Sequence, residues 1–286
     1  MPAGQARHDE MRWHHEDLPL EAVERVAVAD DRLLFYMVAT ASFVEITTDL
    51  YTRNLIEYFQ GDGEVQGWLE AGWEPEELQH GEALRRYVGA AWPDFDWETA
   101  YHAFFAEYKD CCQVEFLGPT RALEMARRCI VEMGTCTYYT MITRSTRCPV
   151  LAELAENIRT DEAGHYRHFH EYFLRYRAEE KPSRPRILRT LIARIREIDG
   201  EDGYLAFKHV WQASNPGRAF EKRYYRRFTR AVRGLAAEHY PFRMAVHMTS
   251  KPLGLPLRAQ RWIDGILAAG SRLAARMTGA ATAALE

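Results

Sequence analysis

Residues 74–84 read EPEELQHGEAL and residues 161–168 read DEAGHYRH, and each stretch places a histidine three positions after a glutamate. The two pairs are Glu77 with His80 and Glu162 with His165. On an α-helix, positions i and i+3 lie on one face, so each pair can direct a carboxylate and an imidazole at one point. One such pair arises easily by chance in a Glu-rich helical protein. Two pairs suggest that other helices supply ligands of the same kind.

Two further glutamates stand in apolar surroundings. Glu45 lies within SFVEITTDLY (42–51), and Glu132 lies within RRCIVEMGTCTYY (127–139). A carboxylate buried without a partner is costly, so each of them is expected to meet a cation. The order along the chain is then Glu45, Glu77-x-x-His80, Glu132, Glu162-x-x-His165.

This order is the ligand set of ferritin-like di-iron and di-manganese bundles, in which two helices give a Glu and two give Glu-x-x-His. Four carboxylates and two imidazoles neutralise two cations and leave coordination positions open for oxygen. The gaps of 32 residues (45 to 77) and 30 residues (132 to 162) suit two helical hairpins of similar size. We therefore predict six metal ligands: Glu45, Glu77, His80, Glu132, Glu162 and His165.

Apolar residues recur at spacings of three and four over most of the chain, which is typical of helices. The predicted fold is all-α, a ferritin-like four-helix bundle with a di-metal carboxylate site and a C-terminal helical extension. Predicted helices cover about 30–60, 64–90, 94–110, 119–145 and 150–179. The predicted domains are an N-terminal segment (1–29), the bundle (30–180) and a basic helical extension (181–286) that packs on the bundle. Breaks in the extension are expected at Gly200, Asn215-Pro216, Pro241 and 251–256.

The composition, 47% hydrophobic and 27% charged over 286 residues, is that of an ordinary globular chain. The first residues hold no apolar run that would serve as a signal peptide, and Arg272 and Arg276 interrupt the alanine-rich tail that resembles a membrane span. We expect a cytoplasmic protein with no membrane partner. The five cysteines lack CxxC spacing and fit reduced thiols; they are Cys111, Cys112, Cys129, Cys136 and Cys148.

Charge divides unevenly along the chain. Residues 181–286 hold 20 Lys and Arg against 8 Asp and Glu, whereas the first 180 hold 17 against 33. The stretch KRYYRRFTRAVR (222–233) places six basic residues at helical spacings. It would suit an acidic carrier protein, the phosphates of a thioester cofactor, or simple packing on the acidic bundle. Its interleaved aromatic residues would also suit nucleic acid, the least favoured of these partners.

Four motifs resemble those of the soluble acyl-carrier-protein desaturases. GWLEAGWEPEELQHGEAL (67–84) resembles the segment in which tryptophans precede their E-N-R-H-G motif, and Asp161-Glu162-Ala-Gly-His165 is similar to their D-E-x-R-H. Glu45 with Tyr51 resembles their E-x5-Y, and Glu132-Met-Gly-Thr135 resembles their E-R-A-T. The resemblance covers roughly residues 30–178. Leu78-Gln79 and Ala163-Gly164 depart from the usual motifs, which puts the acyl-carrier substrate in question.

The resemblance implies that Thr135 is catalytic, either as a hydrogen-bond partner of a bound oxygen species or in proton delivery. It also implies two iron ions, dioxygen as co-substrate and a homodimer. Because the sequence shows no flavin, nicotinamide or iron–sulfur motif, the electrons are expected to come from an external donor, and the resemblance implies a ferredoxin-like one. Asp161 and, less strongly, Glu76 are predicted to accept the second N–H of a ligand histidine. His168 and His170 are expected to be ordinary packed or surface histidines.

The predicted activity is that of an oxygen-dependent non-haem di-iron oxidoreductase that desaturates or hydroxylates an acyl, carrier-bound substrate. An apolar channel would hold the acyl chain, and its candidate lining residues are Met37, Phe43, Met133 and Tyr139. The alternative is a di-iron N-oxygenase or hydroxylase of a small amine. That family carries an extra histidine ligand where this chain has Ile158. A non-enzymatic alternative is an iron-handling protein. The substrate, the electron donor and the choice of iron or manganese stay open.

Overall fold

The structure, a computed structural model, describes residues 11–111, 117–198 and 201–278, and these contain helices, turns and loops but no strand. The all-α prediction is confirmed. Contacts divide the chain into two units that alternate along the sequence. The first comprises Met1–Leu117, Arg147–Asn157 and Glu201–Phe220; the second comprises Gly118–Thr146, Ile158–Gly200 and Glu221–Glu286. The domain limits predicted near 30 and 180 stay predictions.

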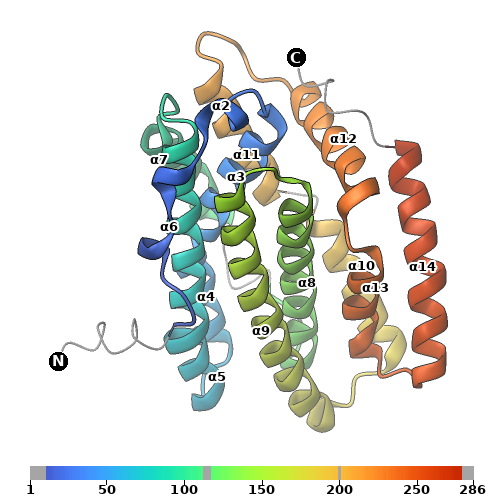
Figure 1. The fold of residues 1–286 in the computed structure, drawn as a ribbon. Coiled ribbons are helices and arrows are strands. Elements are labelled where there is room, and N and C mark those ends of the chain that lie inside the picture. The colour runs from blue at the N-terminus through green and yellow to red at the C-terminus, as the bar shows by residue number, and fades with distance from the viewer. Residues whose placement is uncertain (1–10, 112–116, 199–200, 279–286) are drawn as a thin grey trace. The chain divides into compact units, whose positions relative to one another are not determined.

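The first unit is built around α3 (Arg32–Glu45) and α6 (Glu74–Ala91), which pack along each other (Figure 1). Helix α11 (Glu201–Ser214) packs against α3 and against α7 (Trp97–Tyr108). Aromatic side chains fill the core, and Phe43 on α3 meets Trp97 edge-on at 5.2 Å between ring centroids. The unit also contains η1 (His15–Asp17), η2 (Leu20–Ala22), α2 (Arg25–Val28), α4 (Thr48–Tyr58), α5 (Gly63–Trp68), η3 (Leu69–Trp73), η4 (Lys109–Cys111) and the first residues of α9 (Pro149–Glu180).

The single helix predicted over 30–60 is wrong, because α3 ends at Glu45 and α4 begins at Thr48, with a bend of 40°. The Thr47 hydroxyl donates to the backbone carbonyls of Val44 (2.7 Å) and Phe43 (3.1 Å). Such bonds from a β-branched residue bend a helix. The bend comes directly after a predicted ligand.

Gly81 explains how closely α6 approaches this bend. A Cβ atom at Gly81 would lie 2.5 Å from the backbone nitrogen of Ile46 and 2.6 Å from its Cα. Real Cβ atoms do not approach backbone so closely, so only glycine fits here. The Glu-x-x-His-Gly stretch therefore fixes the distance between α6 and α3 next to His80.

The remaining predicted limits in this unit agree with the structure. Helices α5, η3 and α6 follow one another without a loop, and η3 is a π-helical turn that ends at Trp73. Pro75 follows this turn at the start of α6, and it lacks the N–H that would bond back into the preceding turn of a continuous helix. Asp96 caps the N-terminus of α7, because its side chain accepts from the Thr99 amide at 3.1 Å.

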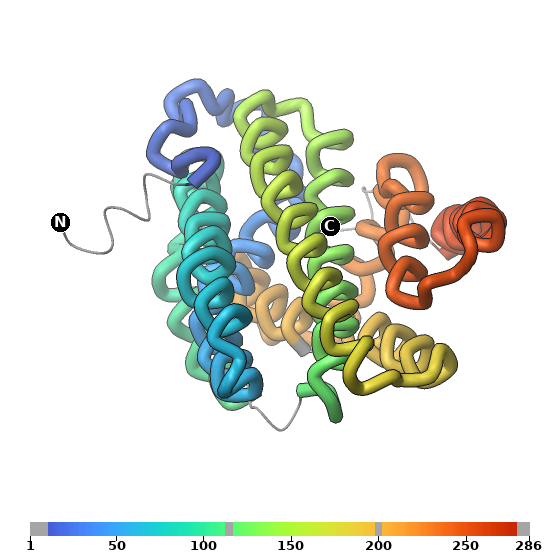
Figure 2. The backbone as a smooth tube through the Cα atoms, turned by 90° about the horizontal axis from the view of Figure 1, so that it is seen from below, coloured from blue at the N-terminus to red at the C-terminus, as the bar shows by residue number. Residues whose placement is uncertain are grey.

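The second unit is built on α8 (Arg121–Ser145), which packs against α10 (Arg184–Ile198), α12 (Lys222–His239) and α13 (Phe242–Ser250). Helix α14 (Leu257–Thr278) packs against α12 and α13, as Figure 2 shows from below. η6 (Lys251–Leu253) and a left-handed Gly254 (φ +60°) lie in the predicted break at 251–256. The breaks at Asn215-Pro216 and Pro241 are also found, whereas Gly200 lies outside the described residues.

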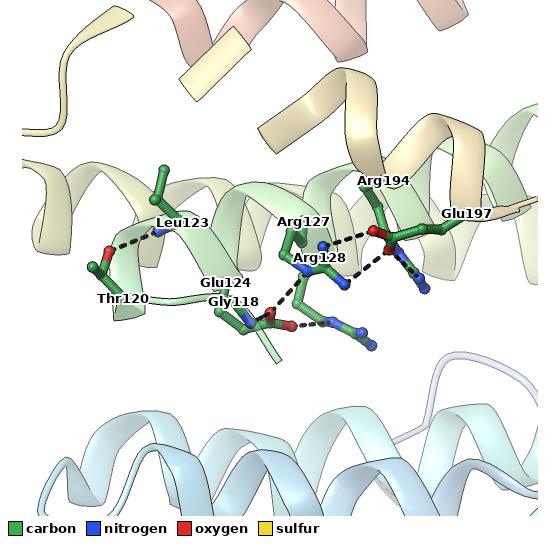
Figure 3. A network of polar contacts seen from close by, with 8 residues as sticks. All are labelled: Gly118, Thr120, Leu123, Glu124, Arg127, Arg128, Arg194 and Glu197. Carbon is green, nitrogen blue, oxygen red and sulfur yellow. Dashed lines mark hydrogen bonds and ion pairs between the residues drawn. The ribbon is translucent and has the colours of Figure 1, made fainter. Parts of the chain in front are cut away.

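The N-terminus of α8 is held by a buried ion network (Figure 3). The fully buried Glu124 carboxylate accepts from Arg128 Nε at 3.0 Å and from the Gly118 amide at 2.6 Å. Its Oε2 also lies 3.2 Å from Arg127 Nε, and Arg127 in turn donates to Glu197 of α10 at 2.9 Å. The network ties the start of α8 to α10 within this unit.

Among the described residues, no single helix is both long and apolar enough to cross a membrane. The bent pair of α3 and α4 meets these criteria jointly, by length and composition alone.

Candidate metal-binding residues

The first unit gathers three of the predicted ligands. Glu45 is the last residue of α3, and Glu77 and His80 lie one turn apart in α6. One ligand atom from each of these three lies within 4.8 Å of the other two. All three residues are buried, with exposed fractions of 6% or less. The packing of α3 on α6 through Gly81 is what brings Glu45 to the Glu-x-x-His face.

The second unit gathers the other three. Glu132 lies in the middle of α8, and Glu162 and His165 lie one turn apart in α9, in the part of that helix that belongs to this unit. Their candidate ligand atoms also lie within 4.8 Å of one another. His165 Nδ1 is 3.6 Å from Glu132 Oε2 and 3.7 Å from Glu162 Oε2. We call these three residues the second triad, and Glu45, Glu77 and His80 the first triad.

Glu132 is a buried carboxylate that pairs with no lysine or arginine among the described residues. It is 1% exposed, and its Oε1 atom has no hydrogen-bond partner among the described residues. No lysine or arginine of the described chain pairs with it; the one basic group at its carboxylate is His165. Burial raises the pKa of Glu132 to about 8, the nearby Glu162 adds to the rise, and His165 opposes it. A bound divalent cation would supply the positive charge that this carboxylate lacks.

The structure places Thr135 directly at the second triad. Thr135 lies one turn after Glu132 on α8, and its hydroxyl donates to Glu162 Oε2 at 2.6 Å. The hydroxyl also lies near the backbone carbonyls of Glu132 (3.2 Å) and Val131 (3.4 Å), but the carboxylate contact is the shortest. A threonine in a helix often bonds only to its own backbone. Here the side chain reaches a predicted ligand of the neighbouring helix.

The other predicted residues take varied positions. Asp161 is 8% exposed on α9, one turn before His165, and Glu76 is half-buried on α6, one turn before His80. His168 is exposed. His170 is buried and stacks on Tyr166 at 6.0 Å, and burial lowers its pKa to about 4. The candidate channel residues Met37, Phe43, Met133 and Tyr139 are all buried.

Sequence reasoning missed a residue that stacks on His80 of the first triad. Trp13 stacks on His80 with ring centroids 6.2 Å apart and planes 9° from parallel. The segment that carries Trp13, residues 11–17, is anchored to α6 because Arg86 donates to the backbone carbonyl of His15, 2.5 Å away. The aromatic and histidine-rich stretch MRWHHED (11–17) was the available signal.

Two further expectations concern cysteines and the basic helix. The four described cysteines, Cys111, Cys129, Cys136 and Cys148, are free thiols, and Cys112 lies outside the described residues. The six basic side chains of α12 are exposed; they are Lys222, Arg223, Arg226, Arg227, Arg230 and Arg233.

No protein-family model, no curated protein and no solved structure matches this chain.

Proposed function

We propose that the six residues of the two triads bind two iron ions and that the protein is an oxygen-dependent non-haem di-iron oxidoreductase with a ferritin-like bundle. The observation that carries the proposal is the second triad. It combines a buried carboxylate that pairs with no lysine or arginine among the described residues, a second buried carboxylate and an imidazole, all within ligand distance of one another. Carboxylate and imidazole are the donor set that suits iron in oxygenases.

The first triad supports the same proposal from independent helices. It repeats the composition of the second, two glutamates and one histidine, with the Glu-x-x-His pair on one helix and the lone Glu on its neighbour. The positions match the order expected for a di-metal carboxylate protein. Two triads of this composition would carry four negative charges, enough to neutralise two divalent ions.

Bound iron would supply the chemistry that activates dioxygen for attack on an unreactive C–H bond. The reduction of dioxygen to two waters consumes four electrons, so desaturation would take two from the substrate and two from an external donor. We propose a ferredoxin-like protein as that donor. The residues of this chain would hold the ions, keep water away through their burial, and present a proton at Thr135 Oγ1.

The likeness of the motifs to acyl-carrier-protein desaturases extends the proposal to an acyl substrate, desaturated or hydroxylated while bound to a carrier. An N-oxygenase of small amines is the alternative. The buried apolar Ile158 stands where that family has its extra histidine ligand, which favours the acyl proposal.

The first experiment is anaerobic titration of the metal-free protein with ferrous iron, followed by counting of bound iron. We expect two ions per chain, and fewer in Glu132→Ala and in Glu77→Ala. Glu171→Ala, an exposed acid on the same helix as Glu162, is the matched control and should still bind two. Two ions bound by Glu132→Ala would contradict the proposed ligand set. Parallel titration with manganese tests the choice of metal.

The second experiment supplies oxygen and a chemical reductant to the iron-loaded protein, with acyl-carrier-protein thioesters, free fatty acids or arylamines as substrates. Mass spectrometry of the products distinguishes loss of two hydrogens, gain of one oxygen and oxidation at nitrogen. Oxygen consumption that yields ferric iron but no organic product with any substrate would favour the iron-handling alternative.

A further inference from the structure

The second unit contains an open cavity of about 610 Å³. It is lined by α13, α14 and the C-terminal end of α8. Four arginines line it, and they come from all three helices: Arg144, Arg243, Arg261 and Arg272. The volume lies within the range of small-molecule sites and is several times larger than an inorganic anion needs.

The positive charge of this cavity is not neutralised by its own walls. Among the described residues, Asp264 is the only carboxylate that lines it; this residue is 5% exposed and already has hydrogen-bond partners. Asp264 Oδ2 lies 2.8 Å from His247 Nδ1, and Oδ1 accepts from Gln260 at 3.0 Å. The cavity wall thus holds four positive arginines and one carboxylate, which already contacts His247 and Gln260. The local excess is about three positive charges.

The arginines themselves are open to a ligand. Arg243 and Arg261 make no hydrogen bond, ion pair or ring contact with the described residues, and both side chains are exposed. Arg144 donates only to the carbonyl of His239, at 3.3 Å, and Arg272 lies over the Phe242 ring at 5.7 Å. None of the four guanidinium groups meets a carboxylate of the described chain. Guanidinium groups bind phosphate and carboxylate oxygens in a bidentate manner.

Apolar side chains form the rest of the wall. Pro241, Phe242, Met244 and Leu257 line the cavity, and Leu257 is 77% exposed. A ligand that bound only through charge would leave this apolar surface in contact with water. The lining therefore suits a molecule with an anionic end and an apolar or aromatic body.

We propose that this cavity binds a phosphate ester with an apolar body. A phosphate monoester carries a charge of about −1.5 to −2 at neutral pH, which matches the excess positive charge better than a single carboxylate does. The same chemistry occurs in a free phosphorylated metabolite and in a phospholipid headgroup. The cavity is independent of the two triads in its residues, so its test does not depend on the proposed metal chemistry.

The test is isothermal titration calorimetry of the metal-free full-length chain with phenyl phosphate, inorganic phosphate and benzoate. Phenyl phosphate should bind more tightly than either of the others, because only it uses both the arginines and the apolar wall. Arg243→Ala and Arg261→Ala should each weaken its binding by about tenfold or more, the loss expected for a charge-assisted hydrogen bond. Both side chains are exposed, so these variants should fold, which circular dichroism would verify.

Arg258→Ala and Arg276→Ala are the matched controls, since both arginines lie on α14 but do not line the cavity. They should bind phenyl phosphate as the parent protein does. Equal weakening in the control and cavity variants would overturn the proposal, as would an affinity for phenyl phosphate no higher than that for inorganic phosphate. Flotation with vesicles that contain phosphatidic acid distinguishes the sources. If the protein binds these vesicles and Arg261→Ala abolishes that binding, the ligand is a lipid headgroup. If the protein binds phenyl phosphate but not the vesicles, the ligand is a soluble ester.

Discussion

The close approach of α6 to α3 gives the sharpest test of how the first triad is built. In Gly81→Ala the new methyl group would start 2.5 Å from Ile46 N and 2.6 Å from Ile46 Cα. An ordinary contact between these atoms needs about 3.4 Å, so the backbones must separate by roughly 0.9 Å, and such overpacking typically costs about 1–3 kcal/mol and sometimes more. Alanine recovers about 1 kcal/mol of helix propensity. Because the clash is with backbone atoms, which yield little, we take the upper end of this range, and the net expectation is a loss of about 2 kcal/mol in the free energy of unfolding.

Gly89→Ala provides the matched comparison, because Gly89 lies on the same helix and nothing lies within 4 Å of a Cβ atom there. That variant should gain up to about 1 kcal/mol. The two substitutions are chemically identical, so their difference of about 3 kcal/mol isolates the contact with Ile46. Urea unfolding of the metal-free proteins, followed by circular dichroism, measures it.

The same displacement should weaken iron binding by the first triad, because it moves Glu45 away from Glu77 and His80. Gly81→Ala should therefore bind iron less tightly than Gly89→Ala. If both variants have the stability and the iron affinity of the parent protein, the reasoning on helix packing is refuted.

Three further predictions concern other parts of the chain. Glu124→Gln should lose about 3 kcal/mol in urea unfolding, since it leaves the buried Arg128 without its charge partner; a loss below 1 kcal/mol would refute the importance of this network. Thr135→Val should keep two irons per chain but slow oxygen consumption by at least about tenfold, whereas Thr135→Ser should stay close to the parent rate; equal rates in all three would exclude a role in proton delivery. Lys208 and His209 hold the pKa of Glu107 below its ordinary value of 4.5, with the Lys208 hydrogen bond the largest cause. A group whose pKa is depressed in the folded protein contributes stability above its unfolded pKa, and this contribution is lost as pH falls through its folded pKa. Glu107→Gln should therefore lower the free energy of unfolding fully at pH 7, and its difference from the parent protein should shrink below pH 4.5. A difference that grows on acidification would contradict this prediction.

The pairs Glu77 with His80 and Glu162 with His165 were predictable because their geometry is local. A spacing of three in a helix fixes which side chains share a face, and each pair lies within one helix, the first in α6 (18 residues) and the second in α9 (32 residues). The apolar neighbours of Glu45 and Glu132 likewise indicated burial, and both residues are buried.

The break after Glu45 could not be predicted from the same pattern. Ile46, Thr47 and Thr48 continue an amphipathic sequence, and the bend depends on Thr47 bonding to its own helix and on the packing of Gly81, 35 residues further along the chain than Ile46. The arginine-lined cavity escaped sequence reasoning for a related reason. Its four arginines come from three separate helices, and each of them alone resembles an ordinary solvated side chain.

The stacking of Trp13 on His80 has a practical consequence for anyone who shortens this protein. A truncation at the domain limit predicted near residue 30 would remove the indole of Trp13. It would also remove the His15 carbonyl to which Arg86 donates a hydrogen bond. The imidazole face of His80 would then be exposed to bulk water. A metal ion bound there should exchange faster with competing metals and chelators. We therefore expect the segment ahead of α3 to shield His80, and a truncated form to exchange metal faster than the full chain.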